Sequence, residues 1–139
     1  MKIGYNCLRV DSSFKGGTTS FAIGLLQGLI NINKKHQIII YVSRSNYHFF
    51  RRFLNHPNCK IVILKCYNNL IDNIIRSTFI FGSPYLYRII NNAFYYLLVN
   101  KMDGESDLIY TPTVTPLAFN HSKKNVISMH DIQQVHYPE

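Results

Sequence analysis

The sequence predicts an α/β protein built on a doubly wound, mainly parallel sheet. Short apolar runs of strand length recur along the 139 residues, and segments whose apolar residues repeat at helical spacing separate most of them. The run at 37–42, Gln-Ile-Ile-Ile-Tyr-Val, is apolar without alternation, which is typical of a parallel strand covered on both faces. The expected order in this single domain is strand, helix, strand, short helix, strand, helix, strand, strand.

Five apolar runs are expected to form the sheet. The first begins at the N-terminus, and the last stops abruptly at the polar pair His130-Asp131. An Asp-led run, Asp107-Leu108-Ile109-Tyr110, precedes the last one across a proline-containing loop. The expected strands cover residues 2–8, 37–42, 60–64, 107–110 and 126–129.

The first helix is expected to follow a loop that ends in Gly16-Gly17. The hydroxyl of Thr18 or Thr19 can cap its N-terminus. Its apolar residues return at i, i+1, i+4 and i+5, which places them on one face of a helix that continues to about residue 33. Glycines at 24 and 28 cost helix stability, and we therefore expect close packing of this helix backbone on the sheet.

The longest helix is expected to begin at Pro84, since proline is favoured at the first helical position and Ser83 can cap it. Its apolar stripe ends near Lys101, and Asp103-Gly104 is expected to form a turn. Shorter helices are expected around 47–54 and 69–79.

The chain is basic, with 15 lysines and arginines against 7 acidic residues and a formal net charge of +8. Such an excess indicates an anionic partner: nucleic acid, a phosphorylated small molecule or an acidic membrane surface. Five cations in segments that follow or link strands could line one face for a phosphorylated or lipid-phosphate acceptor, although an ordinary solvated surface is slightly favoured. These are Arg44, Arg51, Arg52, Lys123 and Lys124.

Aromatic residues lie among the first three of these cations. They favour contact with a membrane surface, but their spacing is also compatible with burial in the core. These are Tyr47, Phe49, Phe50 and Phe53. No stretch approaches the roughly 18 apolar residues that span a bilayer, and the N-terminus does not resemble a secretory signal. We expect a cytoplasmic protein. Peripheral contact with the inner face of the membrane is compatible with this expectation.

Metal and thiol chemistry are not expected. The three cysteines, Cys7, Cys59 and Cys66, form no CxxC pair, so the sequence predicts neither a disulfide framework nor a zinc site. The histidines show no HExxH spacing, and no Gly-x-Ser-x-Gly stretch predicts a nucleophile. No cofactor is expected.

Two stretches are candidates for a site. Glycines at Gly16-Gly17 would let a ligand approach the backbone at a helix N-terminus, which attracts phosphate, or they form an ordinary tight turn. His130-Asp131 ends a strand, where open α/β sheets present their sites. His130 could bond a hydroxyl or share developing charge, or it could be a structural histidine. The two side chains point opposite ways if the strand continues, which argues against a dyad between them.

These stretches together resemble the N-terminal domain of retaining glycosyltransferases of the GT-B fold, family 4. The resemblance rests on Met1-Lys2-Ile3-Gly4-Tyr5, the Gly16-Gly17 loop, Asp107-Leu108-Ile109-Tyr110-Thr111-Pro112, and Ser128-Met129-His130-Asp131-Ile132-Gln133 with Tyr137-Pro138-Glu139. It spans nearly the whole chain, is firmest over 126–139 and weakest over 43–105.

The resemblance implies a nucleotide-sugar donor, a saccharide or lipid-linked acceptor, and transfer with retained configuration. By it, Gly16, Gly17 and Thr18 contact the substrate, His130 lies beside the transferred sugar, and Asp131 supports it or the acceptor. Residues 1–139 are then expected to be a single, incomplete acceptor-side domain, truncated after the His-Asp motif and inactive alone, because the donor-binding C-terminal domain is absent.

Two alternatives to this enzyme domain stay open. The first is a non-catalytic basic module that binds nucleic acid or membrane phosphate, although no nucleic-acid motif supports it and nucleic acid is not the expected partner. The second is an inactive remnant that keeps its α/β core.

Overall fold

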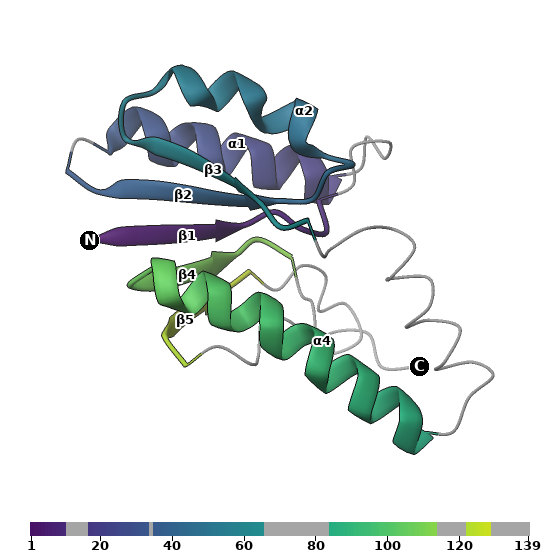
Figure 1. Cartoon of the computed structure of the whole chain (residues 1–139). Helices are drawn as coiled ribbons and strands as arrows, with labels where there is room; N and C mark the ends of the chain where they lie inside the picture. Colours follow the sequence, from purple (N-terminus) through teal and green to yellow (C-terminus); the bar gives the residue numbers. More distant parts are fainter. Residues whose placement is uncertain (11–16, 34, 66–83, 114–121, 129–139) are drawn as a thin grey trace, which may run out of the picture.

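The computed structural model describes residues 1–10, 17–33, 35–65, 84–113 and 122–128, which form one five-stranded sheet with helices on both faces (Figure 1). The strand order is β3-β2-β1-β4-β5, and each neighbouring pair is parallel. The elements are β1 Lys2–Asn6, α1 Gly17–Ile32, β2 Gln37–Val42, α2 Tyr47–Phe50, the 3-10 helix η1 Arg51–Asn55, β3 Cys59–Ile63, α4 Pro84–Glu105, β4 Leu108–Thr111 and β5 Lys124–Ile127.

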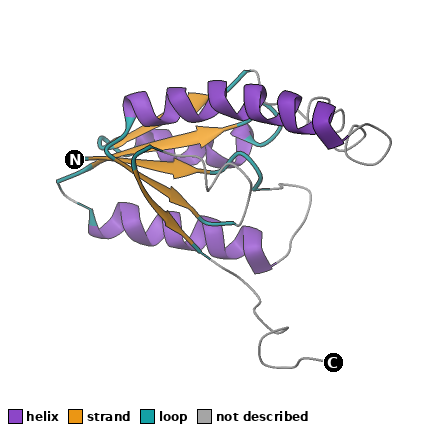
Figure 2. Ribbon diagram, turned by 90° about the horizontal axis from the view of Figure 1, so that it is seen from below, coloured by secondary structure: helices purple, strands orange, loops and turns teal. Residues whose placement is uncertain are grey.

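The sheet is doubly wound, as the sequence predicts. From β1 the chain builds outward to β2 and β3, and it then crosses to the other side of β1 for β4 and β5. Helix α1 lies on one face and α4 on the other, with β1 at the centre (Figures 1 and 2). The expected β2 bounds are confirmed, β5 begins two residues earlier than expected, and the helix expected at 69–79 lies outside the described residues.

The α1 face of the sheet holds the larger of two buried clusters. Tyr5, Ile38 and Ile40 of the sheet pack against Ala22 and Leu26 of α1. The Tyr5 hydroxyl donates a hydrogen bond to the Ala22 carbonyl at 2.8 Å, which ties β1 to the helix. Its burial raises the pKa of this phenol well above the usual value.

The aromatic residues of the segment after β2 also belong to this cluster. Phe50 and Phe53 are 0% and 1% exposed, and Tyr47 and Phe49 pack against the same cluster. The core interpretation is therefore correct for Phe50 and Phe53, which cannot face a membrane, whereas Tyr47 and Phe49 are half-buried at the edge of this cluster. Two short helical turns bring their rings onto the α1 face of the sheet.

The opposite face is covered by the last turns of α4. Leu98, Val99 and Met102 are buried there against sheet residues that include Ile109. The Tyr41 hydroxyl lies 2.9 Å from the Ser106 hydroxyl and donates to the Met102 carbonyl at 3.3 Å. Burial is the main cause that raises the pKa of Tyr41 to about 12.

The turn expected at Asp103-Gly104 is wrong, because α4 continues through both residues to Glu105. Asp103 is only 6% exposed, and its carboxylate accepts hydrogen bonds from the Ser122 backbone at 2.6 Å and the Ser122 hydroxyl at 2.7 Å. The Asp-Gly pair favours a turn by local preference, but the hydrogen bonds from Ser122 stabilise Asp103 within the helix.

Close packing through glycine occurs on β1 and not on α1. A Cβ added at Gly24 or Gly28 would meet nothing within 4 Å, so the expectation for these two glycines is wrong. A Cβ at Gly4 would lie 2.6 Å from both Ile109 Cδ1 and Ser106 Oγ. The central strand therefore depends on a glycine at this position.

Replacing Gly4 with alanine is expected to lower the free energy of unfolding by about 1–3 kcal/mol, because the new methyl group overpacks a buried contact. The matched change Gly28→Ala on exposed α1 is expected to raise it by about 0.5–1 kcal/mol through helix propensity. Urea denaturation followed by circular dichroism measures both. Equal effects of the two changes would contradict the packing at Gly4.

Candidate functional site

The carboxyl ends of β1 and β4 meet at the point where the strand order reverses. Open α/β sheets bind their ligands in the crevice outside such strand ends, because the connections on the two sides diverge there. Asn6 ends β1, Thr111 ends β4, and β5 ends beside them at Ile127. We call this end of the three strands the switch edge.

Two buried polar atoms lie at the switch edge without a hydrogen-bond partner in the described part of the chain. They are Nδ2 of Asn6, which is 3% exposed, and Oγ1 of Thr111, which is 0% exposed. Tyr5 and Tyr110 are register partners, so the next residues, Asn6 and Thr111, lie side by side on one face of the sheet. Because buried polar groups are normally paired, this donor and this hydroxyl are the features of the switch edge that call for a further polar partner.

The loop that leaves β1 is held in place by Asn46. The Asn46 Nδ2 donates to the carbonyl of Cys7 at 2.7 Å and to that of Val10 at 2.9 Å. Its Oδ1 accepts from the Ser43 backbone at 2.9 Å, and the side chain is buried. Asn46 therefore fixes the path of the chain at the switch edge. The Ser-x-x-Asn spacing after β2 is the only sequence signal for this role, and it is a common loop pattern.

The end of β5 is joined to β4 by two contacts. The Ser128 backbone donates to the Thr111 carbonyl at 3.1 Å, and the hydroxyls of Ser128 and Tyr110 share a hydrogen bond. These contacts hold the chain at the switch edge two residues before His130. His130 and Asp131 themselves lie outside the described residues.

Among the predicted substrate-binding residues, Gly17 and Thr18 are exposed in the first turn of α1. Because the helix begins at Gly17, Thr18 and Thr19 both lie within its first turn and neither precedes it, so the expectation that one of them is the cap residue is wrong. Space around Gly17 is open, with nothing within 4 Å of an added Cβ. Gly16 lies outside the described residues.

The cations expected to share a face do not lie together. Arg44 follows the carboxyl end of β2, whereas Lys124 begins β5 and so lies at the opposite, amino edge of the parallel sheet. Arg52 stacks over the Phe53 ring, 4.9 Å from its centre. The solvated-surface interpretation therefore fits these residues better than a single basic face.

The cysteines and the possible metal ligands of the described residues were compared with what thiol and metal sites require. Burial raises the pKa of the Cys7 thiol well above its usual value, which disfavours a reactive thiolate. The part of the chain that the structure describes holds no group of three or more His, Cys, Asp or Glu side chains that could bind a metal. Within those same ranges, no helix is long and apolar enough to cross a bilayer.

Comparisons with known proteins find no matching family model, no similar curated protein and no similar solved structure. The functional assignment therefore depends on the switch edge and on the residues that lead into it.

Removing the Thr111 hydroxyl with Thr111→Val is expected to raise the free energy of unfolding by about 1 kcal/mol, since the buried hydroxyl makes no bond that offsets its desolvation. The contrasting change Tyr41→Phe removes a bonded hydroxyl and is expected to lower it by about 1 kcal/mol. Urea denaturation measures both. A destabilised Thr111→Val protein would mean that the hydroxyl is partnered and would remove it from the candidate site.

Proposed function

We propose that this chain is the acceptor-side domain of a retaining glycosyltransferase, which moves a sugar from a nucleotide-sugar donor to a saccharide or lipid-linked acceptor. The observation that carries the proposal is the pair of unpartnered buried polar atoms on Asn6 and Thr111 at the switch edge. A sugar hydroxyl can accept a hydrogen bond from the Asn6 amide, and it can donate to or accept from the Thr111 hydroxyl. A sugar therefore suits this pair of groups.

The sequence resemblance adds the remaining parts of the proposed site. Gly17 and Thr18 lie in the first turn of α1, Gly16 precedes them in the sequence, and the open space at Gly17 supports a diphosphate or acceptor approaching the backbone. His130 donates a hydrogen bond to the transferred sugar, and Asp131 supports the acceptor. The Ser128 contacts to β4 support this proposal, because they bring the chain to the switch edge just before the pair.

Two measurements test this function. In the first, the amide signals of the chain are followed by NMR while saccharides and nucleotide sugars are added. Shifts are expected at the switch edge, at Cys7, Gly17, Thr111 and Ser128, and not at Lys60 or Lys124 at the amino edge. Shifts confined to the amino edge, or none with any sugar ligand, would contradict the proposal.

The second measurement is sugar transfer by a longer chain completed with a donor-binding domain. His130→Ala is expected to lower the rate by about 100-fold, the usual scale for losing one positioned catalytic group. The control His56→Ala changes a histidine in the turn between η1 and β3 and should leave the rate unchanged. Full activity of the His130→Ala protein would remove the proposed role.

The proposal includes peripheral contact with an anionic membrane surface, which would bring the domain to a lipid-linked acceptor. Helix α4 supports this contact through four exposed apolar or aromatic residues, Tyr85, Ile89, Tyr96 and Leu97, which are 49–74% exposed. The chain has no acidic residue between Asp72 and Asp103. An exposed apolar helix surface of this kind can enter the headgroup region of a bilayer.

Sedimentation with phosphatidylglycerol vesicles tests this contact. The double change Tyr96→Ser and Leu97→Ser is expected to weaken binding by about tenfold, because two apolar groups no longer enter the lipid. Leu54→Ser removes an exposed apolar residue from η1 and serves as the control. Equal losses in both proteins would argue against α4 as the contact surface.

A further inference from the structure

A cavity lies at the amino end of the strands, away from the switch edge. It has a volume of about 430 Å³ and is lined by Ile3, Tyr5, Leu29, Ile32, Asn33, Lys35, His36 and Ile38. It lies on the α1 face of the sheet, whereas Asn6 and Thr111 belong to the α4 face. Its occupant is therefore independent of the proposed glycosyl transfer.

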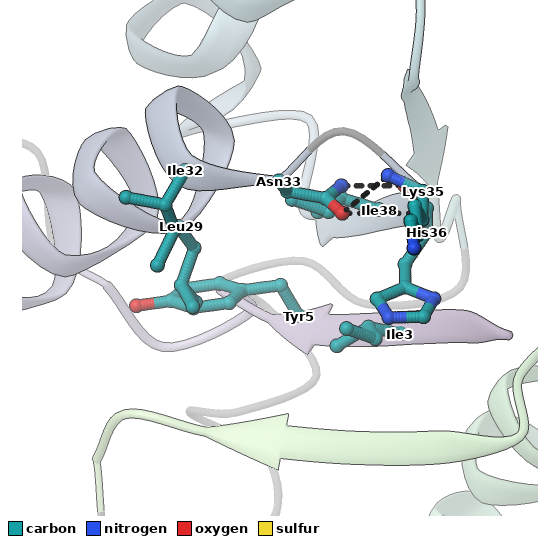
Figure 3. Close-up of a pocket in the computed structure, with 8 residues that line it drawn as sticks. All are labelled: Ile3, Tyr5, Leu29, Ile32, Asn33, Lys35, His36 and Ile38. Atoms are coloured by element: carbon teal, nitrogen blue, oxygen red, sulfur yellow. Dashed lines mark hydrogen bonds between the residues drawn. The ribbon is translucent and has the colours of Figure 1, made fainter.

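The walls of this cavity are apolar. Figure 3 shows Leu29 and Ile32 coming from α1 above the ring of Tyr5, with Ile3 nearer the amino end of β1. The Tyr5 hydroxyl is already bonded to the Ala22 carbonyl, so the tyrosine contributes its ring and not a polar group. Ile32 is 77% exposed and provides an apolar edge at the opening. Such a surface suits a hydrocarbon chain.

The polar residues of the cavity are gathered in the turn between α1 and β2. The Asn33 Oδ1 accepts hydrogen bonds from the backbones of Lys35 and His36, at 3.3 and 2.9 Å, and its Nδ2 donates to the His36 carbonyl. Asn33 thereby uses its own polar groups within the turn and fixes the backbones of Lys35 and His36. His36 lies over Ile3 in Figure 3.

The charge at this end of the cavity has one sign. Lys35 carries a positive charge, His36 follows it in the sequence, and the eight lining residues include no carboxylate. Both side chains are exposed, so the cation can meet a head group without the cost of burying it. A cavity with apolar walls and a fixed cationic end matches a molecule with one apolar tail and one anionic head.

We propose that this cavity binds a single-chain anionic lipid, with the hydrocarbon chain against Ile3, Leu29 and Ile38 and the carboxylate beside Lys35 and His36. The ligand class is a long-chain fatty acid. The volume is within the usual range for small-molecule pockets.

Displacement of a fluorescent fatty acid by palmitate, below the concentration at which palmitate forms micelles, tests the proposal. Saturable binding of one palmitate per chain is expected. Lys35→Glu is expected to weaken it by about tenfold, since it replaces an attractive charge with a repulsive one. Lys101→Glu makes the same charge change on exposed α4, outside the cavity, and should leave the affinity within about twofold.

The apolar part of the cavity is tested separately. Ile32→Glu alters an exposed lining residue, so folding is retained, and it is expected to weaken palmitate binding at least as much as Lys35→Glu. Hexadecanol, which has the same chain without the charge, is expected to bind about tenfold more weakly than palmitate. In a series of shorter fatty acids, affinity should rise by about fourfold per methylene until the cavity is full.

Circular dichroism melting confirms that each variant is folded before its affinity is compared. Equal weakening by Lys35→Glu and Lys101→Glu would show general charge attraction and overturn the assignment of the head group. Binding that never saturates, or no displacement by palmitate at all, would overturn the site.

Discussion

The position of β1 at the centre of the sheet is the constraint on which the rest of the structure depends. On one side of the strand, the Tyr5 hydroxyl binds the Ala22 carbonyl and fixes α1. On the other, the missing side chain of Gly4 leaves the space that Ile109 and Ser106 occupy. A strand covered on both faces must meet two different packing requirements in consecutive residues, and glycine followed by tyrosine meets both.

The same central strand contributes to both places that we propose as ligand sites. Its carboxyl end meets β4 where the strand order reverses, and there Asn6 and Thr111 keep buried polar atoms without described partners. Its amino end contributes Ile3 to an apolar cavity under the end of α1. The proposed ligands differ because the surroundings differ: the first place has buried polar atoms without partners, and the second has apolar walls.

Much of the fold could be predicted from the sequence because its signal is local. The apolar run of β2 and the Pro84 start of α4 both lie where they are expected. The candidate site was predicted only in part. Gly17 lies at the N-terminus of α1, but Asn6 and Thr111 were missed, since a single polar residue at the end of an apolar run is common and says nothing about its partner. Only the pairing of β1 with β4 sets these two side by side.

The sequence by itself determined the class of the fold and the type and approximate bounds of most described elements, because hydrophobic periodicity follows from backbone geometry within a few residues. The tertiary structure decided which side of β1 each strand joins, that Phe50 and Phe53 enter the core, and that Asp103 stays helical through its bonds to Ser122. Those outcomes depend on contacts between residues far apart in the chain, and no local pattern contains them.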